Sequence, residues 1–179
     1  IDASVFFYGA FEKPLLYFMS DVAESIREKH PNTKITFVDI GANTGQHSLY
    51  MSQFAESVVA FEPFPLVSQK FKKQISLNKI TNIQLYECGL SDKDESLTFY
   101  APTGSNQGTG SFDKNTATKG NKGTSKLKLY NGDEFVKRGQ TKQISLIKID
   151  VEGFEKRVLT GLKATLAGNR PLIICEVSY

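Results

Sequence analysis

The chain has 179 residues, of which 40% are hydrophobic, 23% charged and 11% aromatic, a composition that excludes wholesale disorder. This length suits one domain that buries roughly 70% of its unfolded surface. With 22 Lys and Arg residues against 19 Asp and Glu residues, the formal net charge is only +3, far less positive charge than a general nucleic-acid binder concentrates.

The order of apolar runs along the chain predicts its fold. Residues 1–34 contain one predicted helix, over residues 11–30, which we expect to form an N-terminal helical cover on a sheet. Later apolar runs predict strands at residues 35–41, 57–63, 83–90, 145–150 and 171–177, with helices at residues 45–55, 66–77 and 154–166. Strands that alternate with helices predict an α/β fold with a mostly parallel sheet and helices on both faces.

One segment, residues 102–125, interrupts this alternation between short predicted strands at residues 97–100 and 126–130. It is rich in Gly, Ser, Thr, Asn and Lys and has no periodicity. Loops of this length in compact domains are usually functional or mobile, so this flexible loop is either a solvated excursion or a lid that binds an acceptor.

The most informative motif is the turn after the first strand, where Gly41 and Gly45 stand four residues apart and a helix begins at once. Ligands of open α/β sheets bind beyond the carboxyl ends of the strands, where a helix N-terminus offers unpaired N–H groups. A dinucleotide site requires glycine where this chain has Asn43 and Gln46. Asn43 suits the carboxylate and ammonium of an amino acid, and Asp39 suits a nearby cation. The turn therefore favours S-adenosylmethionine, a zwitterion with a sulfonium, although a turn without any ligand is the alternative.

Residues at the ends of the second and third strands extend this predicted cofactor site. Glu62 ends the second strand, 21 residues after Gly41, near the separation at which an acid accepts hydrogen bonds from ribose hydroxyls. A glutamate at a strand end can also simply be solvated. Phe64 and Leu90 are placed to sandwich an adenine ring or to pack as core, and Gly89 precedes Leu90 in the same predicted cofactor set.

Together these residues resemble the FkbM-like family of S-adenosylmethionine-dependent methyltransferases. The matching pieces follow in family order at residues 38–45, 59–65, 89–92, 148–153, 158–161 and 173–177. The resemblance implies a class I methyltransferase (Rossmann-like) fold, with residues 35–179 as the S-adenosylmethionine-binding domain, and methylation of hydroxyl groups on sugars, polysaccharide units or polyketide-type products. It also implies that the cofactor is contacted by Asp39, Gly41, Asn43, Gly45 and Glu62.

The resemblance further places Asp150 and Glu152 at the mouth where methyl group and acceptor meet. A hydroxyl acceptor must lose its proton as it attacks, so a base has to lie within hydrogen-bond reach. Asp150 is the first candidate and Glu152 the second, although both could instead cap the helix that follows. Lys148 shares a strand face with this acidic pair and can orient or neutralise it. His47 follows the glycine turn and could act as base or shield the cofactor.

Two features depart from the family pattern. The family has a Thr-Leu-Asp element before the fourth strand, whereas this chain has residues 131–133, which keep only the aspartate. The sequence stops at Tyr179, directly after the fifth strand, where the fold normally adds a C-terminal hairpin of two more strands.

A non-catalytic S-adenosylmethionine-binding module is therefore one alternative function. RNA methylation, suggested by lysines between residues 114 and 128, is a weaker one, and a nicotinamide dehydrogenase comes last because of Asn43.

The predicted partner is a small-molecule or glycan hydroxyl acceptor, with neither a membrane nor a nucleic acid. Two histidines and the separated Cys88 and Cys175 give no metal-ligand spacing. No apolar run approaches the ~20 residues that cross a bilayer. Because the cysteines make no disulfide framework, a reducing and cytoplasmic location is predicted.

Overall fold

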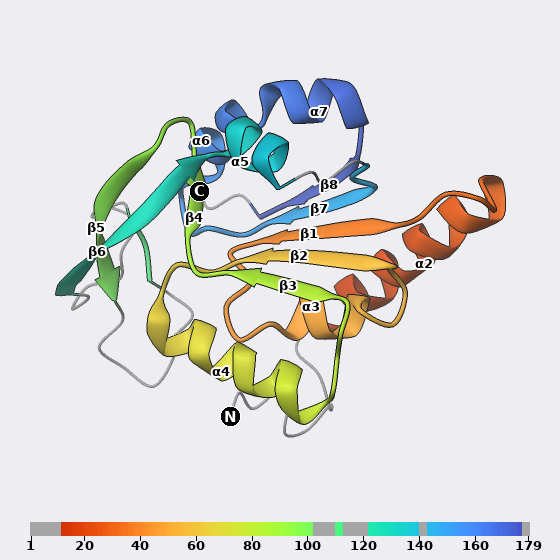
Figure 1. The fold of residues 1–179 in the computed structure, drawn as a ribbon, viewed down its shortest axis with the longest axis horizontal. Coiled ribbons are helices and arrows are strands. Elements are labelled where there is room, and N and C mark those ends of the chain that lie inside the picture. Colours follow the sequence, from red (N-terminus) through yellow and green to blue (C-terminus); the bar gives the residue numbers. More distant parts are fainter. Residues whose placement is uncertain (1–11, 102–109, 113–121, 140–142, 177–179) are drawn as a thin grey trace.

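The computed structural model describes residues 12–101, 110–112, 122–139 and 143–176. Its main sheet has five strands in the order β3-β2-β1-β7-β8, and every neighbouring pair is parallel. These strands are β1 (Thr36–Ile40), β2 (Ser57–Phe61), β3 (Ile83–Tyr86), β7 (Leu146–Ile149) and β8 (Leu172–Cys175). With helices on both sides of this sheet (Figure 1), the structure confirms the predicted α/β, class I methyltransferase-type architecture.

Two groups of helices cover the sheet (Figure 1). They are α2 (Lys13–Lys29), α3 (Gln46–Met51) and α4 (Pro65–Leu77) on one side, and α5 (Gly132–Arg138), α6 (Glu155–Gly161) and α7 (Lys163–Asn169) on the other. Alternation along β1 decides which face each side chain covers. Phe37 therefore packs with Met19 of α2, whereas Val38 packs with Val158 of α6. Helix α2 thus shares the core of the sheet. The division into an N-terminal cover, residues 1–34, and a cofactor-binding domain, residues 35–179, stays a prediction.

The winding direction of the main sheet reverses at β1, which pairs with β2 on one side and with β7 on the other. Ile40 is in register with Phe61 of β2 and with Ile149 of β7, so three strands end side by side. Ligands of open α/β sheets bind at such a reversal, beyond the carboxyl ends of the strands. The glycine turn and the residues that follow β2 and β7 are therefore brought to one edge.

A second sheet differs from the prediction. It has the order β4-β6-β5 and consists of β4 (Gly89–Ser91), β5 (Glu95–Ala101) and β6 (Lys122–Asn131). The predicted strand at residues 83–90 is thus two strands, and the second leaves the main sheet to pair with β6. The prediction was wrong here because an apolar run does not show which distant strand it will pair with.

The loop predicted at residues 102–125 is shorter than expected, because β6 already begins at Lys122. Of that loop the structure describes only residues 110–112 outside β6, so its predicted role as a lid lies outside the described residues. The same holds for Lys114 and Lys119 of the predicted lysine-rich segment.

The helix predicted at residues 154–166 is also two helices, α6 and α7, which meet at Leu162. The carboxylate of Asp133 accepts hydrogen bonds from the backbone N–H groups of Ala164 and Thr165, at 2.9 and 2.7 Å, and so caps the start of α7. Periodicity alone misses this break because the capping residue lies about thirty positions earlier in the chain.

Helix α5 was not predicted, although its sequence carries a start signal. Asn131 precedes it, and the Asn131 side chain accepts a hydrogen bond at 3.0 Å from the backbone N–H of Glu134. Asn at this position with two acids in the first turn is a common N-terminal helix signal.

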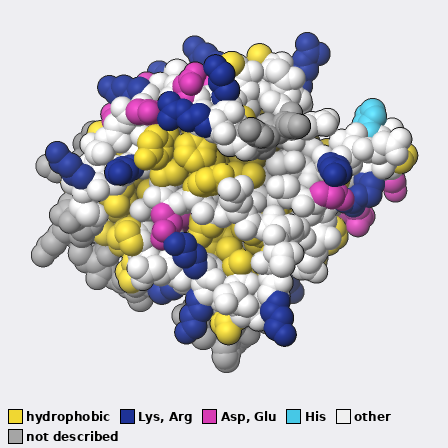
Figure 2. Space-filling view, in the orientation of Figure 1, with side chains coloured by type: hydrophobic (Ala, Val, Ile, Leu, Met, Phe, Trp, Pro, Cys, Tyr) yellow, Lys and Arg dark blue, Asp and Glu magenta, His cyan; other side chains and the backbone are white. Residues whose placement is uncertain are grey.

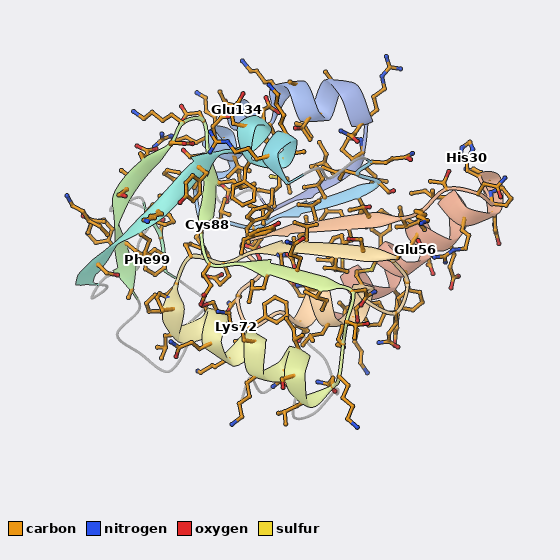
Figure 3. All side chains as sticks on the ribbon, viewed as in Figure 1. His30, Glu56, Lys72, Cys88, Phe99 and Glu134 are labelled. Atoms are coloured by element: carbon orange, nitrogen blue, oxygen red, sulfur yellow. The ribbon has the colours of Figure 1, made fainter. Side chains whose placement is uncertain are left out.

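Other predictions concern the cysteines, the membrane and the second histidine. Cys88 and Cys175 are both free, and Cys88 is buried in the main core (Figure 3). Figure 3 places His30 at the end of α2, far from the carboxyl ends of the strands. In the part of the chain that the structure describes, no helix has the length and apolar content that spanning a membrane requires.

Candidate active site

The turn after β1 requires glycine at both of its ends. Gly41 has φ +81° and Gly45 has φ +87°, a backbone region that other residues rarely adopt. A Cβ on Gly41 would lie 1.9 Å from the carbonyl oxygen of Asp150, and one on Gly45 would lie 2.0 Å from the Phe71 ring. The two glycines therefore let the turn pass against β7 and against α4, which fixes its path.

The same turn is joined to the end of β2 through Glu62. The Glu62 Oε2 accepts a hydrogen bond from the backbone N–H of Asn43 at 2.9 Å, and its Oε1 accepts one from that of Phe64 at 2.8 Å. Asn43 itself has φ +51°, so it is the turn conformation that aims this N–H at the carboxylate. Two residues that the sequence predicted to act together are thus in direct contact.

The burial of Glu62 controls its charge. The side chain is 7% exposed, and burial raises its pKa to about 7 against the opposing effect of the two N–H groups. Each carboxylate oxygen keeps a second lone pair beyond its one N–H partner. The group can therefore accept two further hydrogen bonds when it is ionised.

A buried ionic group lies between β1 and β7. Asp39 is in register with Lys148, and Asp39 accepts a hydrogen bond at 2.6 Å from the hydroxyl of Ser48. Lys148 is 4% exposed and donates from Nζ to Oδ2 of Asp150 at 2.8 Å. Burial disfavours the Lys148 ammonium, but the carboxylates of Asp39 and Asp150 outweigh it and raise the pKa of Lys148. Lys148 is therefore a permanent cation that orients Asp150, one of the roles predicted for it.

Two atoms of this region lack hydrogen bonds in the described part of the chain. They are Oδ1 of Asp39, whose side chain is completely buried, and Nε2 of His47, whose side chain is 8% exposed. Buried polar atoms without partners are uncommon, and each calls for an explanation such as a bound water, an ion or a catalytic role. Both atoms lie where the sequence placed cofactor and acceptor.

His47 lies at the start of α3, with its Nε2 3.3 Å from Oε2 of Glu12. Burial is the main effect on this imidazole and lowers its pKa, although the nearby carboxylate of Asp39 opposes it. His47 is therefore neutral near pH 7, so its contact with Glu12 is not an ion pair. A neutral imidazole is able to accept a proton.

Carboxylates gather beyond the ends of β7 and β8. Glu176 follows β8 as Asp150 follows β7, and its backbone N–H donates to the carbonyl of Ile149 at 3.0 Å. The negative charge of Asp150 and, next, burial raise the pKa of Glu176 to about 7. Burial and then the charge of Asp150 raise the pKa of Glu152 as well. The structure thus brings together the predicted pair and adds Glu176.

The turn that carries Glu152 is held from the second sheet. Glu152 has φ +51°, and its carbonyl oxygen accepts a hydrogen bond at 2.6 Å from the hydroxyl of Ser111, which is 1% exposed. The backbone of Ser111 is paired with that of Tyr100 on β5. Phe112 packs between the rings of Phe99 and Phe154, at 5.2 and 5.5 Å between ring centres. Residues 110–112 therefore link β5 to the acidic turn.

Three contributors to this site were missed by the sequence analysis: Glu12, Ser111 and Glu176. Glu176 could have been found, because it stands at the carboxyl end of a strand next to that of Asp150. Glu12 and Ser111 come from the N-terminal segment and from the long loop. No local pattern marks either of them.

Of the two residues predicted to contact the adenine, Phe64 lies beside Glu62, whereas Leu90 lies in the core. Phe64 is half-buried beside Glu62 and packs on Phe99 at 4.9 Å between ring centres. Leu90, in contrast, is 2% exposed and belongs to the main core cluster, and Gly89 is buried in the same strand, β4. This placement favours the core role for Leu90, because β4 has left the main sheet.

No group of His, Cys, Asp or Glu side chains among the described residues could hold a metal ion. The residues at this edge do fit S-adenosylmethionine. Glu62 has acceptor positions left for two ribose hydroxyls, and Asp39 keeps an unpartnered oxygen.

Comparison with known proteins agrees with this geometry. The family model described as the methyltransferase FkbM domain matches residues 39–179. Methyltransferase 1 of Beauveria bassiana is 34% identical over 142 residues, 70% of this chain and 57% of that protein. The hexuronic acid methyltransferase AglP of Haloferax volcanii is 31% identical over 129 residues, 72% of this chain and 50% of that protein. The chain thus spans about half the length of the curated relatives it matches.

Among solved structures, a Streptococcus mutans protein in complex with S-adenosylhomocysteine matches with a TM-score of 0.45 and 12% identity, over 88% of this chain and 67% of that one. The family match covers the glycine turn, Glu62 and the acidic pair after β7. The chain belongs to the FkbM methyltransferase domain family, and its cofactor is S-adenosylmethionine.

Proposed function

We propose that the protein transfers a methyl group from S-adenosylmethionine to a hydroxyl group of a sugar, a glycan or a secondary metabolite. The observation that carries this proposal is the contact between the backbone of Asn43 and the carboxylate of Glu62, at the reversal point of the sheet and next to the strand that ends in Asp150. This contact joins the turn that would bind the cofactor to the carboxylate that would accept hydrogen bonds from its ribose, and both lie beside the candidate base Asp150.

The cofactor would be held by the turn between Gly41 and Gly45 and by Glu62. The two free acceptor positions of Glu62 match the two ribose hydroxyls. Phe64 lies next to Glu62 and offers a half-buried ring to the adenine. S-adenosylmethionine supplies a methyl group that is already activated by its bond to a positive sulfur.

The acceptor hydroxyl has to lose its proton as it attacks. Asp150 is the first candidate for the base, because Lys148 fixes its position with a 2.8 Å hydrogen bond and keeps a cation beside it. Glu152 and the neutral imidazole of His47 are the next candidates. Lys148 itself cannot take the proton, because its pKa is raised and it stays charged. The protein thus contributes position and a proton acceptor.

One relative supports a sugar-like acceptor. The name of the Haloferax volcanii relative states a hexuronic acid as its substrate, and sugars are among the acceptors that the resemblance implied. The basic side chains on one face of the molecule do not favour RNA. On the face drawn in Figure 2, Lys and Arg side chains are spread around the outline with acidic side chains among them, rather than gathered in one patch.

The proposal is tested by calorimetry with S-adenosylhomocysteine and by transfer of labelled methyl groups to a panel of hydroxyl compounds. Wild-type protein should bind the ligand, and Glu62→Gln should weaken binding about tenfold or more by losing charge-assisted hydrogen bonds. Asp150→Asn should bind normally and lose most methyl transfer. No binding to folded wild-type protein would overturn the proposal, whereas binding without transfer to any acceptor would favour the non-catalytic module.

A further inference from the structure

Two carboxylates compete for the single ammonium group of Lys148. Asp39 is in register with Lys148 across the parallel pair of β1 and β7, so the two side chains lie on the same face of the sheet. Asp150 follows two residues after Lys148, and its Oδ2 accepts a hydrogen bond from Nζ of Lys148 at 2.8 Å. Oδ1 of Asp39, in contrast, has no hydrogen-bond partner in the described part of the chain. The ammonium thus binds Asp150 and leaves its register partner.

Burial alone predicts the opposite choice. Asp39 is 0% exposed, whereas the side chain of Asp150 is 27% exposed and keeps contact with water. A carboxylate that has lost its water requires hydrogen bonds or a cation to compensate for the cost of burial. Asp39 therefore has more to gain from the ammonium of Lys148 than Asp150 has, and some other contact must hold it back.

That contact is the hydroxyl of Ser48, in the first turn of α3. It donates to Oδ2 of Asp39 at 2.6 Å, the short distance expected for a hydroxyl that binds a charged oxygen. Ser48 is itself 0% exposed, so water does not compete for this bond. Because the bond fixes Oδ2 toward α3, the carboxylate of Asp39 cannot turn toward Lys148 without losing it.

We infer that Ser48 is a positioning residue for the base: its hydroxyl holds Asp39 back, so that the ammonium of Lys148 stays on Asp150. The inference rests on the proposed function, because it takes Asp150 as the group that accepts the proton of the acceptor hydroxyl. Ser48 acts only through Asp39 and Lys148. A residue of the helix that follows the cofactor turn thereby sets the geometry of the acceptor side.

The direct test is a crystal structure of the Ser48→Ala protein. Without the hydroxyl, Nζ of Lys148 should lie within about 3 Å of an oxygen of Asp39 and should have left Asp150. If Lys148 still binds Asp150, the inference is overturned and the proposed function stands, because this measurement requires neither cofactor nor acceptor. Ser48→Cys, which keeps the size of the side chain but offers only a weak donor, should give the same result and serves if Ser48→Ala does not fold.

Ser20→Ala is the matched control. Ser20 is 5% exposed, and its hydroxyl donates at 2.9 Å to the carbonyl oxygen of Tyr17 within α2, so its loss also removes a buried hydrogen bond. Lys148 should stay on Asp150 in this variant. If Ser20→Ala moved Lys148 as Ser48→Ala does, a general loosening of the core would explain the change and the inference would be overturned.

Methyl transfer gives the second measurement. Ser48→Ala should lower kcat about tenfold or more, because the base is displaced, while affinity for S-adenosylhomocysteine falls by no more than about threefold. Asp39→Asn removes the charge that attracts Lys148, so in that background Ser48→Ala should lower kcat by about twofold at most. Equal losses of kcat in the two backgrounds, or a loss of ligand affinity as large as the loss of kcat, overturn the inference.

The failure of the proposed function would look different. If the wild-type protein transfers no methyl group to any hydroxyl compound, the proposed function is overturned, together with the part of the inference that concerns the base. The crystal structure of Ser48→Ala then decides alone whether Ser48 controls which carboxylate Lys148 binds.

Discussion

The two halves of the proposed site are built by different means. In the cofactor half, backbone N–H groups and glycine conformations hold Glu62 in place, all within residues 41–64. In the acceptor half, Lys148 holds Asp150 and Ser111 holds the turn of Glu152, and the other side chains come from distant segments of the chain. Cofactor binding thus depends on short local motifs, whereas the acceptor region depends on the tertiary arrangement of distant segments.

The strongest test of this contrast is Gly41→Ala, because Gly41 touches both halves. A Cβ there would lie 1.9 Å from the carbonyl oxygen of Asp150, in a backbone with φ +81°. Strain and overpacking together should lower the free energy of unfolding by about 3 kcal/mol and abolish S-adenosylhomocysteine binding. Urea unfolding and calorimetry measure both.

The matched control is Gly168→Ala in α7, where a Cβ would have no neighbour within 4 Å. Its stability should stay the same or rise by up to ~1 kcal/mol, as expected for Ala in a helix. If Gly41→Ala behaved like this control, the close approach of the turn to β7 would not exist.

The next largest effect on stability is expected from Lys148→Met. This substitution leaves two carboxylates, Asp39 and Asp150, without their buried cation. Breaking a buried ion pair on one side costs about 3–5 kcal/mol, and urea unfolding should show a loss of that order. Lys72→Met is the control, because Lys72 forms its ion pair with Glu87 at the surface and should cost at most ~1 kcal/mol. Equal losses in the two variants would contradict the buried arrangement around Lys148.

The cofactor half should also respond to pH through Glu62. Because the pKa of Glu62 is raised from 4.5 to about 7, the folded protein holds a proton that the unfolded chain has lost between these values. The contribution of this group to the free energy of unfolding is therefore present below pH 4.5 and is lost as pH rises through about 7.

Ligand binding should show the opposite trend, since the ribose hydroxyls need the ionised carboxylate. Affinity for S-adenosylhomocysteine should rise about tenfold between pH ~6 and ~8 in a calorimetric series. Glu62→Gln should flatten that rise. An unchanged slope in this variant would show that another group controls it.

The smallest effect is expected from Ser111→Ala, which removes the 2.6 Å hydrogen bond to the carbonyl oxygen of Glu152. Stability should fall by about 1 kcal/mol, the usual effect of losing a neutral hydrogen bond. The KM for the acceptor should rise several-fold while S-adenosylhomocysteine affinity stays unchanged, because only the acceptor half is loosened.

Ser52→Ala removes a comparable 2.7 Å bond to the carbonyl of Leu49 in α3 and should leave the acceptor KM unchanged. Ser111→Thr, which keeps the hydroxyl, should restore most of the acceptor affinity. A rise in KM with both Ser52→Ala and Ser111→Ala would mean a general loss of stability rather than positioning of Glu152.

The same contrast explains what the sequence could predict. The order of strands and helices and the glycine turn follow from local patterns such as the apolar run that ends at Gly41. Asn43 and Glu62 were both predicted for the cofactor site because both follow strands that a parallel sheet brings together, whereas the hydrogen bond between them was not predicted. What was missed depends on distant partners, as with the departure of β4 to pair with β6 and the hydrogen bond from Ser111 to Glu152.

The most direct measurement is a crystal structure of the protein with S-adenosylhomocysteine. The account predicts both ribose hydroxyls within about 2.7 Å of the Glu62 carboxylate and the sulfur on the side of Asp150. A ribose bound away from Glu62, or a sulfur directed away from the end of β7, would contradict it.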